Sequence, residues 1–146
     1  MKEISVDTFS EVMGVAPRKV REALYSRYNI KTKSSGLLSA LKGKKEERTK
    51  KLHDSLKAAQ APRELEFLKE LFRNWLFHQR PMLKDTLDFL EVKNDNGLVE
   101  VETDFFKNLN EKKVSELISH LTSKYPKDAI RIYFTFMEVP HFHRYL

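Results

Sequence analysis

The sequence contains no cysteine, only four glycines and five prolines among its 146 residues, and no long apolar run. The absence of cysteine excludes a disulfide framework, a thiolate metal site and a cysteine nucleophile. So few glycines and prolines do not suit a turn-dense β-sandwich or a fibrous repeat. No segment approaches the roughly 18 apolar residues of a membrane helix, and the first residues lack the apolar core of a signal peptide. We therefore expect a soluble, intracellular (cytoplasmic) protein that does not bind membranes.

The apolar content is nevertheless sufficient for a folded core. Hydrophobic residues make up 40% of the chain and aromatic residues 11%, including ten phenylalanines. The charged fraction of 33% indicates a well-solvated surface, but it does not approach the composition of a disordered polyelectrolyte. The length fits one ordinary domain, or one domain with a small accessory unit.

The formal net charge of +6 is concentrated in one part of the chain. Between Arg18 and Lys57, forty residues hold thirteen basic and four acidic side chains, a net charge of +9, which leaves −3 for the remainder. Such asymmetry is typical of proteins that bind a polyanion, either a nucleic acid or another anionic surface. A solvated helix face followed by a charged linker would produce the same pattern.

Apolar residues at helical spacing predict an all-α fold. The strongest stripe follows Pro62 and consists of Leu65, Leu68, Leu71, Phe72, Trp75 and Leu76. Further stripes follow Pro81 and end before Pro126. Two stretches, 98–102 and 130–136, alternate apolar and polar residues and could form a minor β-hairpin, although the second fits a helix equally well.

The same pattern predicts three segments. Residues 1–42 form a small basic helical unit, residues 43–61 a charged linker or connecting helix, and residues 62–146 a C-terminal helical bundle. The middle segment is assigned on its composition, because residues 42–51 contain no large apolar side chain and only a thin apolar stripe follows them.

Residues 6–24 carry the most informative motif. Ser10 is small enough to let two short helices cross closely, and Gly14, four residues later, suits a sharp turn with positive φ. The residues expected in the core of this motif are Phe9, Val12, Met13, Val15, Val20 and Leu24. This stretch resembles the helix-turn-helix unit of bacterial and phage DNA-binding proteins. It departs from that pattern at Ala16, where a serine or threonine usually caps the second helix.

The resemblance implies that a second helix, beginning at Pro17, enters the major groove of DNA. The residues that would lie at the groove are Arg18, Lys19, Arg21, Glu22 and Tyr25. The residues that would attract phosphates without regard to sequence are Lys31, Lys33, Lys44, Lys45, Arg48, Lys50 and Lys51. We therefore expect a non-enzymatic nucleic-acid-binding protein, with double-stranded DNA as its partner and a role in transcription regulation.

A helical adaptor or assembly protein is the alternative interpretation. Its basic N-terminal part would dock an acidic partner, and its aromatic-rich C-terminal part could bind a protein or a second copy of the chain. No cofactor and no metal are expected, because His141 and His143 have no acidic or histidine partner nearby in sequence. A dinucleotide fingerprint, a complete phosphate loop and a nucleophile elbow are also missing, so no catalytic residue is assigned.

Overall fold

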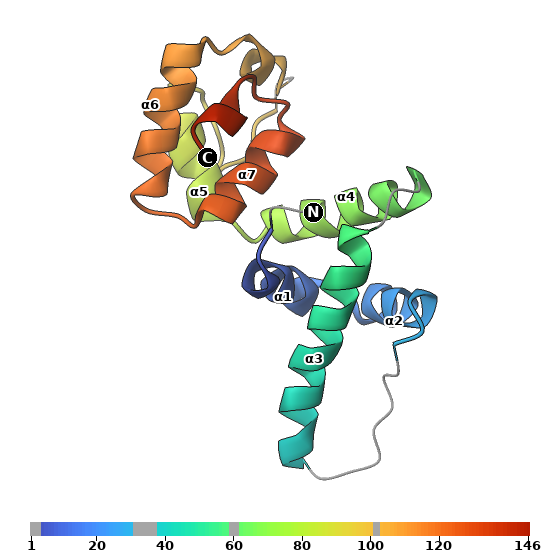
Figure 1. Cartoon of the computed structure of the whole chain (residues 1–146). Helices are drawn as coiled ribbons and strands as arrows, with labels where there is room; N and C mark the ends of the chain where they lie inside the picture. Colours follow the sequence, from blue (N-terminus) through green and yellow to red (C-terminus); the bar gives the residue numbers. More distant parts are fainter. Residues whose placement is uncertain (1–3, 31–37, 59–61, 101–102) are drawn as a thin grey trace. The chain divides into compact units, whose positions relative to one another are not determined.

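The computed structural model describes residues 4–30, 38–58, 62–100 and 103–146, without the side chains of residues 38–44, 62–65 and 103. Within these ranges the chain forms seven α-helices and two short 3-10 helices, and no strand (Figure 1). The predicted all-α class is confirmed. The chain divides into two compact units, Met1–Trp75 (unit 1) and Leu76–Leu146 (unit 2).

Unit 1 is built from α1 (Val6–Val15), α2 (Arg18–Arg27), α3 (Leu38–Lys57) and all but the last residue of α4 (Pro62–Leu76). Helices α1 and α2 both pack against α3 (Figure 1). The side chain of Ser5 caps α1 by accepting a hydrogen bond from the Thr8 amide at 3.2 Å. Ala16 and Pro17 are both extended and separate α1 from α2.

The core of unit 1 agrees with the predicted motif in part. The expected core residues that are buried are Phe9, Val12, Met13 and Leu24. Val15, in contrast, is 38% exposed, and Val20 is only half-buried. Gly14 lies within α1 and has no positive φ, so the expected glycine turn is wrong. The extended backbone at Ala16 and Pro17 makes the turn instead, and Ser10 is exposed to solvent.

Helix α3 contains most of the segment predicted to be a linker or connecting helix. It is continuous to Lys57, and its second half buries four side chains at helical spacing: Thr49, Leu52, His53 and Leu56. Two of the four are polar, which explains why the apolar stripe in the sequence looked thin. The division between the compact units falls after Trp75 rather than before Pro62, so α4 is grouped with unit 1 and not with the C-terminal bundle.

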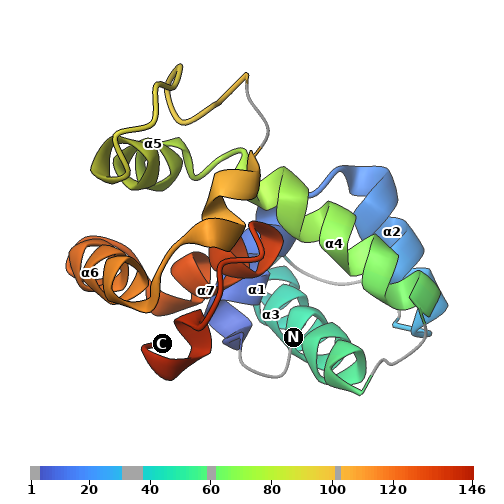
Figure 2. The same ribbon diagram turned by 90° about the horizontal axis from the view of Figure 1, so that it is seen from above.

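Unit 2 consists of α5 (Arg80–Phe89), η1 (Thr103–Asn108), α6 (Glu111–Thr122), α7 (Lys127–Phe136) and η2 (Phe142–Arg144). Helix α6 packs against α5, α7 and η2 (Figure 2). The side chain of Asn110 caps α6 by accepting a hydrogen bond from the Lys113 amide at 2.9 Å. The fully buried large side chains of this unit are Met82, Leu87, Phe106, Leu117, Leu121, Ile130 and Phe134.

The two stretches of alternating sequence do not form a hairpin. Residues 130–136 lie in α7, where Ile130, Tyr133 and Phe134 are buried at helical spacing, so the helical interpretation of this stretch is confirmed and the hairpin interpretation is wrong there. Leu98 makes a single antiparallel bridge with Asp95. Residues 99–100 form no strand, and 101–102 lie outside the described residues. Helix α7 is buried on more than one side, so its apolar residues do not form the single stripe at helical spacing by which a helix is recognised in a sequence.

A carboxylate on α5 is bound by two side chains that follow α6. Lys124 Nζ and the Tyr125 hydroxyl each donate a hydrogen bond to Asp85 Oδ2 at 2.9 Å. The hydrogen bond from Lys124, supported by the one from Tyr125, lowers the pKa of Asp85. Burial, together with the hydrogen bond to Asp85, raises the pKa of Tyr125 to about 12. At neutral pH the ionised carboxylate therefore accepts from a protonated phenol and connects α5 to the end of α6.

We expect acid to weaken unit 2 through this carboxylate. The folded-state pKa of Asp85 is depressed, so its stabilising contribution is complete above the unfolded-state pKa of about 4 and disappears as the pH falls through the folded-state value. Urea titrations between about pH 2 and pH 7, followed by NMR signals of unit 2, measure this. Asp85→Asn should flatten the pH dependence. An unchanged pH profile in that variant would contradict the expectation.

Candidate nucleic-acid interface

One arginine holds the turn between α1 and α2. Arg21 Nη1 donates to three carbonyl oxygens at the end of α1, those of Met13, Gly14 and Ala16, at 3.4, 3.3 and 2.9 Å. Carbonyls at a helix end have no helical donor and lie at the negative end of the helix dipole, so a guanidinium satisfies both requirements. Arg21, which the resemblance places at a DNA groove, is thus half-buried and occupied in holding α2 against α1.

The solvent-facing side of α2 begins with two basic residues. Arg18 and Lys19 are exposed in the first turn, and the Arg18 side chain is 83% accessible. Glu22 and Ser26 follow one and two turns later on the same side and are also exposed. Leu24 points to the opposite side and is buried. The structure therefore brings Arg18, Lys19 and Glu22 together on one exposed face, hereafter the α2 face.

Arg18 and Glu22 form an ion pair on the α2 face. Arg18 Nε donates to Glu22 Oε1 at 2.7 Å across one helical turn. This hydrogen bond raises the pKa of the Arg18 guanidinium. Both side chains are more than half exposed, so the pair contributes little to stability and can exchange for a contact with an incoming anion. Glu22 therefore positions the Arg18 side chain, while the stability of the fold depends little on this ion pair.

Tyr25 lies between α2 and α3 rather than on the α2 face. Its hydroxyl is 3.5 Å from Thr49 Oγ1, and Thr49 in turn donates to the Lys45 carbonyl at 3.0 Å. Thr49 is buried and Tyr25 is half-buried. The predicted contact of Tyr25 with nucleic acid stays a prediction, while its observed contact joins two helices.

The basic residues of α3 alternate with acids. Lys45, Lys50 and Lys51 are exposed, and Arg48 is half-buried. Lys51 forms an ion pair with Glu47 at 2.6 Å, with both side chains more than half exposed. The positive charge described on α3 is therefore distributed along the helix and partly compensated locally.

Three of the predicted phosphate-binding lysines cannot be placed. Lys31 and Lys33 lie outside the described residues, as does the side chain of Lys44. The basic side chains that are described at or near solvent in α2 and α3, and that were predicted from the sequence as contacts, are Arg18, Lys19, Lys45, Arg48, Lys50 and Lys51. We call this set the basic surface. Its members lie on α2 and α3, two consecutive helices that pack against each other.

The described ranges contain no group of three or more histidine, aspartate or glutamate side chains placed to hold a metal ion. His141 and His143 are both exposed, and the His143 ring lies 3.8 Å from that of Phe142, centroid to centroid. Among the helices in these ranges, none combines the length and the apolar character needed to cross a bilayer.

Two features of unit 1 were not anticipated from the sequence. His53 is completely buried, and a pocket brings Arg27 together with Phe67. The burial of His53 could have been predicted from the sequence, because His53 adjoins Leu52 and precedes Leu56 by three residues, which places it on the same side of a helix. The pocket could not have been predicted, because Arg27 belongs to α2 and Phe67 to α4, and no local sequence pattern relates them.

Comparison with known proteins gives no assignment. No family model matches the chain, and neither the curated proteins nor the solved structures include a significant match. The geometry of the α2 face and of the basic surface is therefore the basis for a functional proposal.

Proposed function

We propose that unit 1 binds double-stranded DNA through the α2 face. The observation that carries the proposal is the exposure of Arg18 and Lys19 in the first turn of a helix that Arg21 holds against α1. A helix presented in this way, with its first turn directed outward, suits entry into a major groove. Arginine and lysine can donate to guanine edges there or to the flanking phosphates.

The beginning of α2 also attracts anions through its backbone. Its N-cap residue is Pro17, which supplies no side-chain cap, so the first amides of the helix keep their hydrogen-bonding capacity. The positive end of the helix dipole favours a phosphate at the same place. Lys45 and Lys50, exposed on α3, would add attraction that does not depend on base sequence. A regulatory role for such binding is part of the proposal.

Association with a duplex of about 20 base pairs should be salt-dependent. If Arg18, Lys19, Lys45 and Lys50 each meet one phosphate, the logarithm of the association constant should fall with the logarithm of salt concentration with a slope of about −3 to −4. Fluorescence anisotropy with labelled duplex, beginning at about 50 mM salt, measures both affinity and slope. If no salt-dependent association appears at that salt concentration, the proposal is wrong.

Neutralising the α2 face should weaken this binding selectively. The double variant Arg18→Gln/Lys19→Gln should lose about tenfold in affinity or more, and its salt slope should become shallower by about 2. Lys93→Gln/Lys112→Gln removes the same charge from exposed positions of unit 2 and serves as the matched control. If both variants lose equal affinity, net charge and not the α2 face is responsible. Loss of an acidic protein partner without loss of DNA binding would favour the adaptor alternative.

A further inference from the structure

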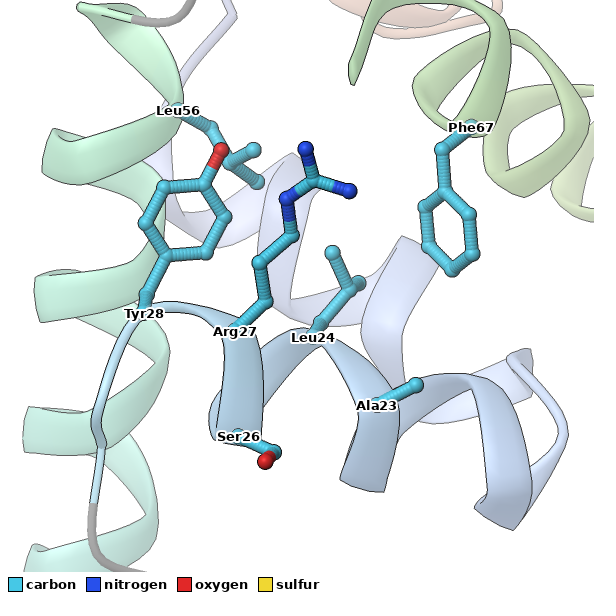
Figure 3. Close-up of a pocket in the computed structure, with 7 residues that line it drawn as sticks. All are labelled: Ala23, Leu24, Ser26, Arg27, Tyr28, Leu56 and Phe67. Atoms are coloured by element: carbon cyan, nitrogen blue, oxygen red, sulfur yellow. The ribbon is translucent and has the colours of Figure 1, made fainter. Parts of the chain in front are cut away.

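A pocket of about 420 Å³ lies within unit 1, between α2, the end of α3 and α4 (Figure 3). Its apolar walls come from three helices, since Leu24 belongs to α2, Leu56 to α3 and Phe67 to α4. Leu24 and Leu56 are buried, and the Phe67 ring stands across the opening from them. The volume falls within the range of small-molecule sites, which are mostly apolar with a few polar groups that orient the ligand.

The polar groups of this pocket favour an anion. Figure 3 shows the Arg27 side chain extending into the space between the Tyr28 ring and the Phe67 ring. The Tyr28 hydroxyl oxygen is buried, whereas the Ser26 side chain lies on the other side of α2 from the Arg27 guanidinium (Figure 3). None of the described residues that line the pocket is acidic. A guanidinium next to apolar and aromatic surface is well suited to a planar carboxylate, which it can bind through two parallel hydrogen bonds.

We propose that this pocket binds a small organic carboxylate with an aromatic body. The carboxylate pairs with Arg27, and the aromatic body packs between the Arg27 side chain and the Phe67 ring, over Leu24. Aromatic rings on two sides of the pocket favour a flat ligand, because offset or edge-to-face contacts add to the burial of apolar surface. The site is distinct from the α2 face and does not depend on DNA binding.

Titration of the ¹⁵N-labelled 146-residue chain with 2-naphthoate tests the proposal. 2-Naphthylmethanol is the matched uncharged probe, because it keeps the ring system and lacks the carboxylate. We expect 2-naphthoate to bind about tenfold more tightly than the alcohol or better, with the largest amide shifts at the residues that line the pocket, such as Ala23 and Leu56. Equal affinity for the two probes, or no shifts at these amides with millimolar 2-naphthoate, would overturn it.

Variants assign the recognition to particular side chains. Arg27→Gln should weaken 2-naphthoate binding about tenfold and leave the alcohol unaffected, whereas Phe67→Ala should weaken both probes. Arg18→Gln, which removes the same charge from the α2 face, should bind 2-naphthoate like the parent chain. If Arg27→Gln binds 2-naphthoate with unchanged affinity, the carboxylate is not recognised there and the proposal fails. The Arg18→Gln/Lys19→Gln variant tests the DNA proposal separately, so either proposal can fail without the other.

Discussion

Replacing Gly97 with alanine should destabilise unit 2 by about 3 kcal/mol or more. Gly97 has a φ of +83°, in the region where side-chain-bearing residues are strained. A Cβ atom at this position would lie 2.8 Å from Leu83 Cβ, 2.9 Å from the Lys84 amide nitrogen and 3.1 Å from the Arg80 carbonyl oxygen. Two of these three neighbours are backbone atoms of α5, which cannot move aside cheaply.

The turn around Gly97 gives the residue little freedom to relax. The Gly97 amide donates to Asn94 Oδ1 at 3.0 Å. Asp95 and Leu98 exchange two backbone hydrogen bonds of 2.8 and 2.9 Å around it. A shift large enough to relieve the contact with α5 would lengthen these hydrogen bonds. The cost should therefore appear as lost stability and not as a local rearrangement.

Gly14→Ala is the matched control for this substitution. Gly14 lies in α1 with no neighbouring atom within 4 Å of an added Cβ, so alanine there should stabilise unit 1 by about 0.5–1 kcal/mol. Urea titrations followed by NMR signals resolved for each unit give both values. A Gly97→Ala variant as stable as the parent chain would show that the turn at residues 94–97 yields more easily than its hydrogen bonds indicate.

Replacing His53 with alanine should destabilise unit 1 by about 3 kcal/mol. His53 is completely buried, and its ring centroid lies 5.4 Å from that of Phe9. His53 Nε2 lies 2.8 Å from the Ile4 carbonyl oxygen, and because a carbonyl only accepts, Nε2 is the donor. The substitution removes both the ring from the core and the donor from that carbonyl.

His53→Phe separates these two contributions, because it keeps an aromatic ring and loses only the donor. It should cost about 1–3 kcal/mol, less than alanine. Asp54→Ala is the surface control: the Asp54 side chain is 58% exposed and 3.6 Å from His53 Nδ1, so its loss should change stability by less than about 0.5 kcal/mol. Urea denaturation followed by fluorescence of Trp75, the single tryptophan of the chain, reports on unit 1. Equal stability of His53→Ala and the parent chain would contradict the assigned role.

Helices with a one-sided apolar stripe could be predicted from the sequence. The stripe after Pro62 becomes α4, with Leu68, Leu71 and Trp75 buried, and the one that ends before Pro126 becomes α6. Pro17 marks the start of α2 because proline fits the beginning of a helix but not its interior. The exposure of Arg18 and Lys19 also agrees with the sequence analysis, because helical phase sets them apart from Leu24.

Other features depended on contacts between distant residues. The polarity of Thr49 and His53 concealed the buried side of α3, which becomes recognisable only when α1 packs against it. Gly14 was predicted to form a turn because glycine can adopt a positive φ. Glycine can equally adopt helical angles, and Gly14 does so within α1. Arg21 has the same charge as Arg18, and only the position of the α1 carbonyls directs it to the turn.

Composition and local periodicity are sufficient to predict the all-α class, the location of the excess positive charge and the start of α2, because these features involve no other part of the chain. Packing between helices sets which of the charged residues face solvent, which one caps α1, and that Arg27 and Phe67 share a pocket. Helical phase gives each side chain a direction, whereas the partner found in that direction depends on contacts between segments far apart in sequence.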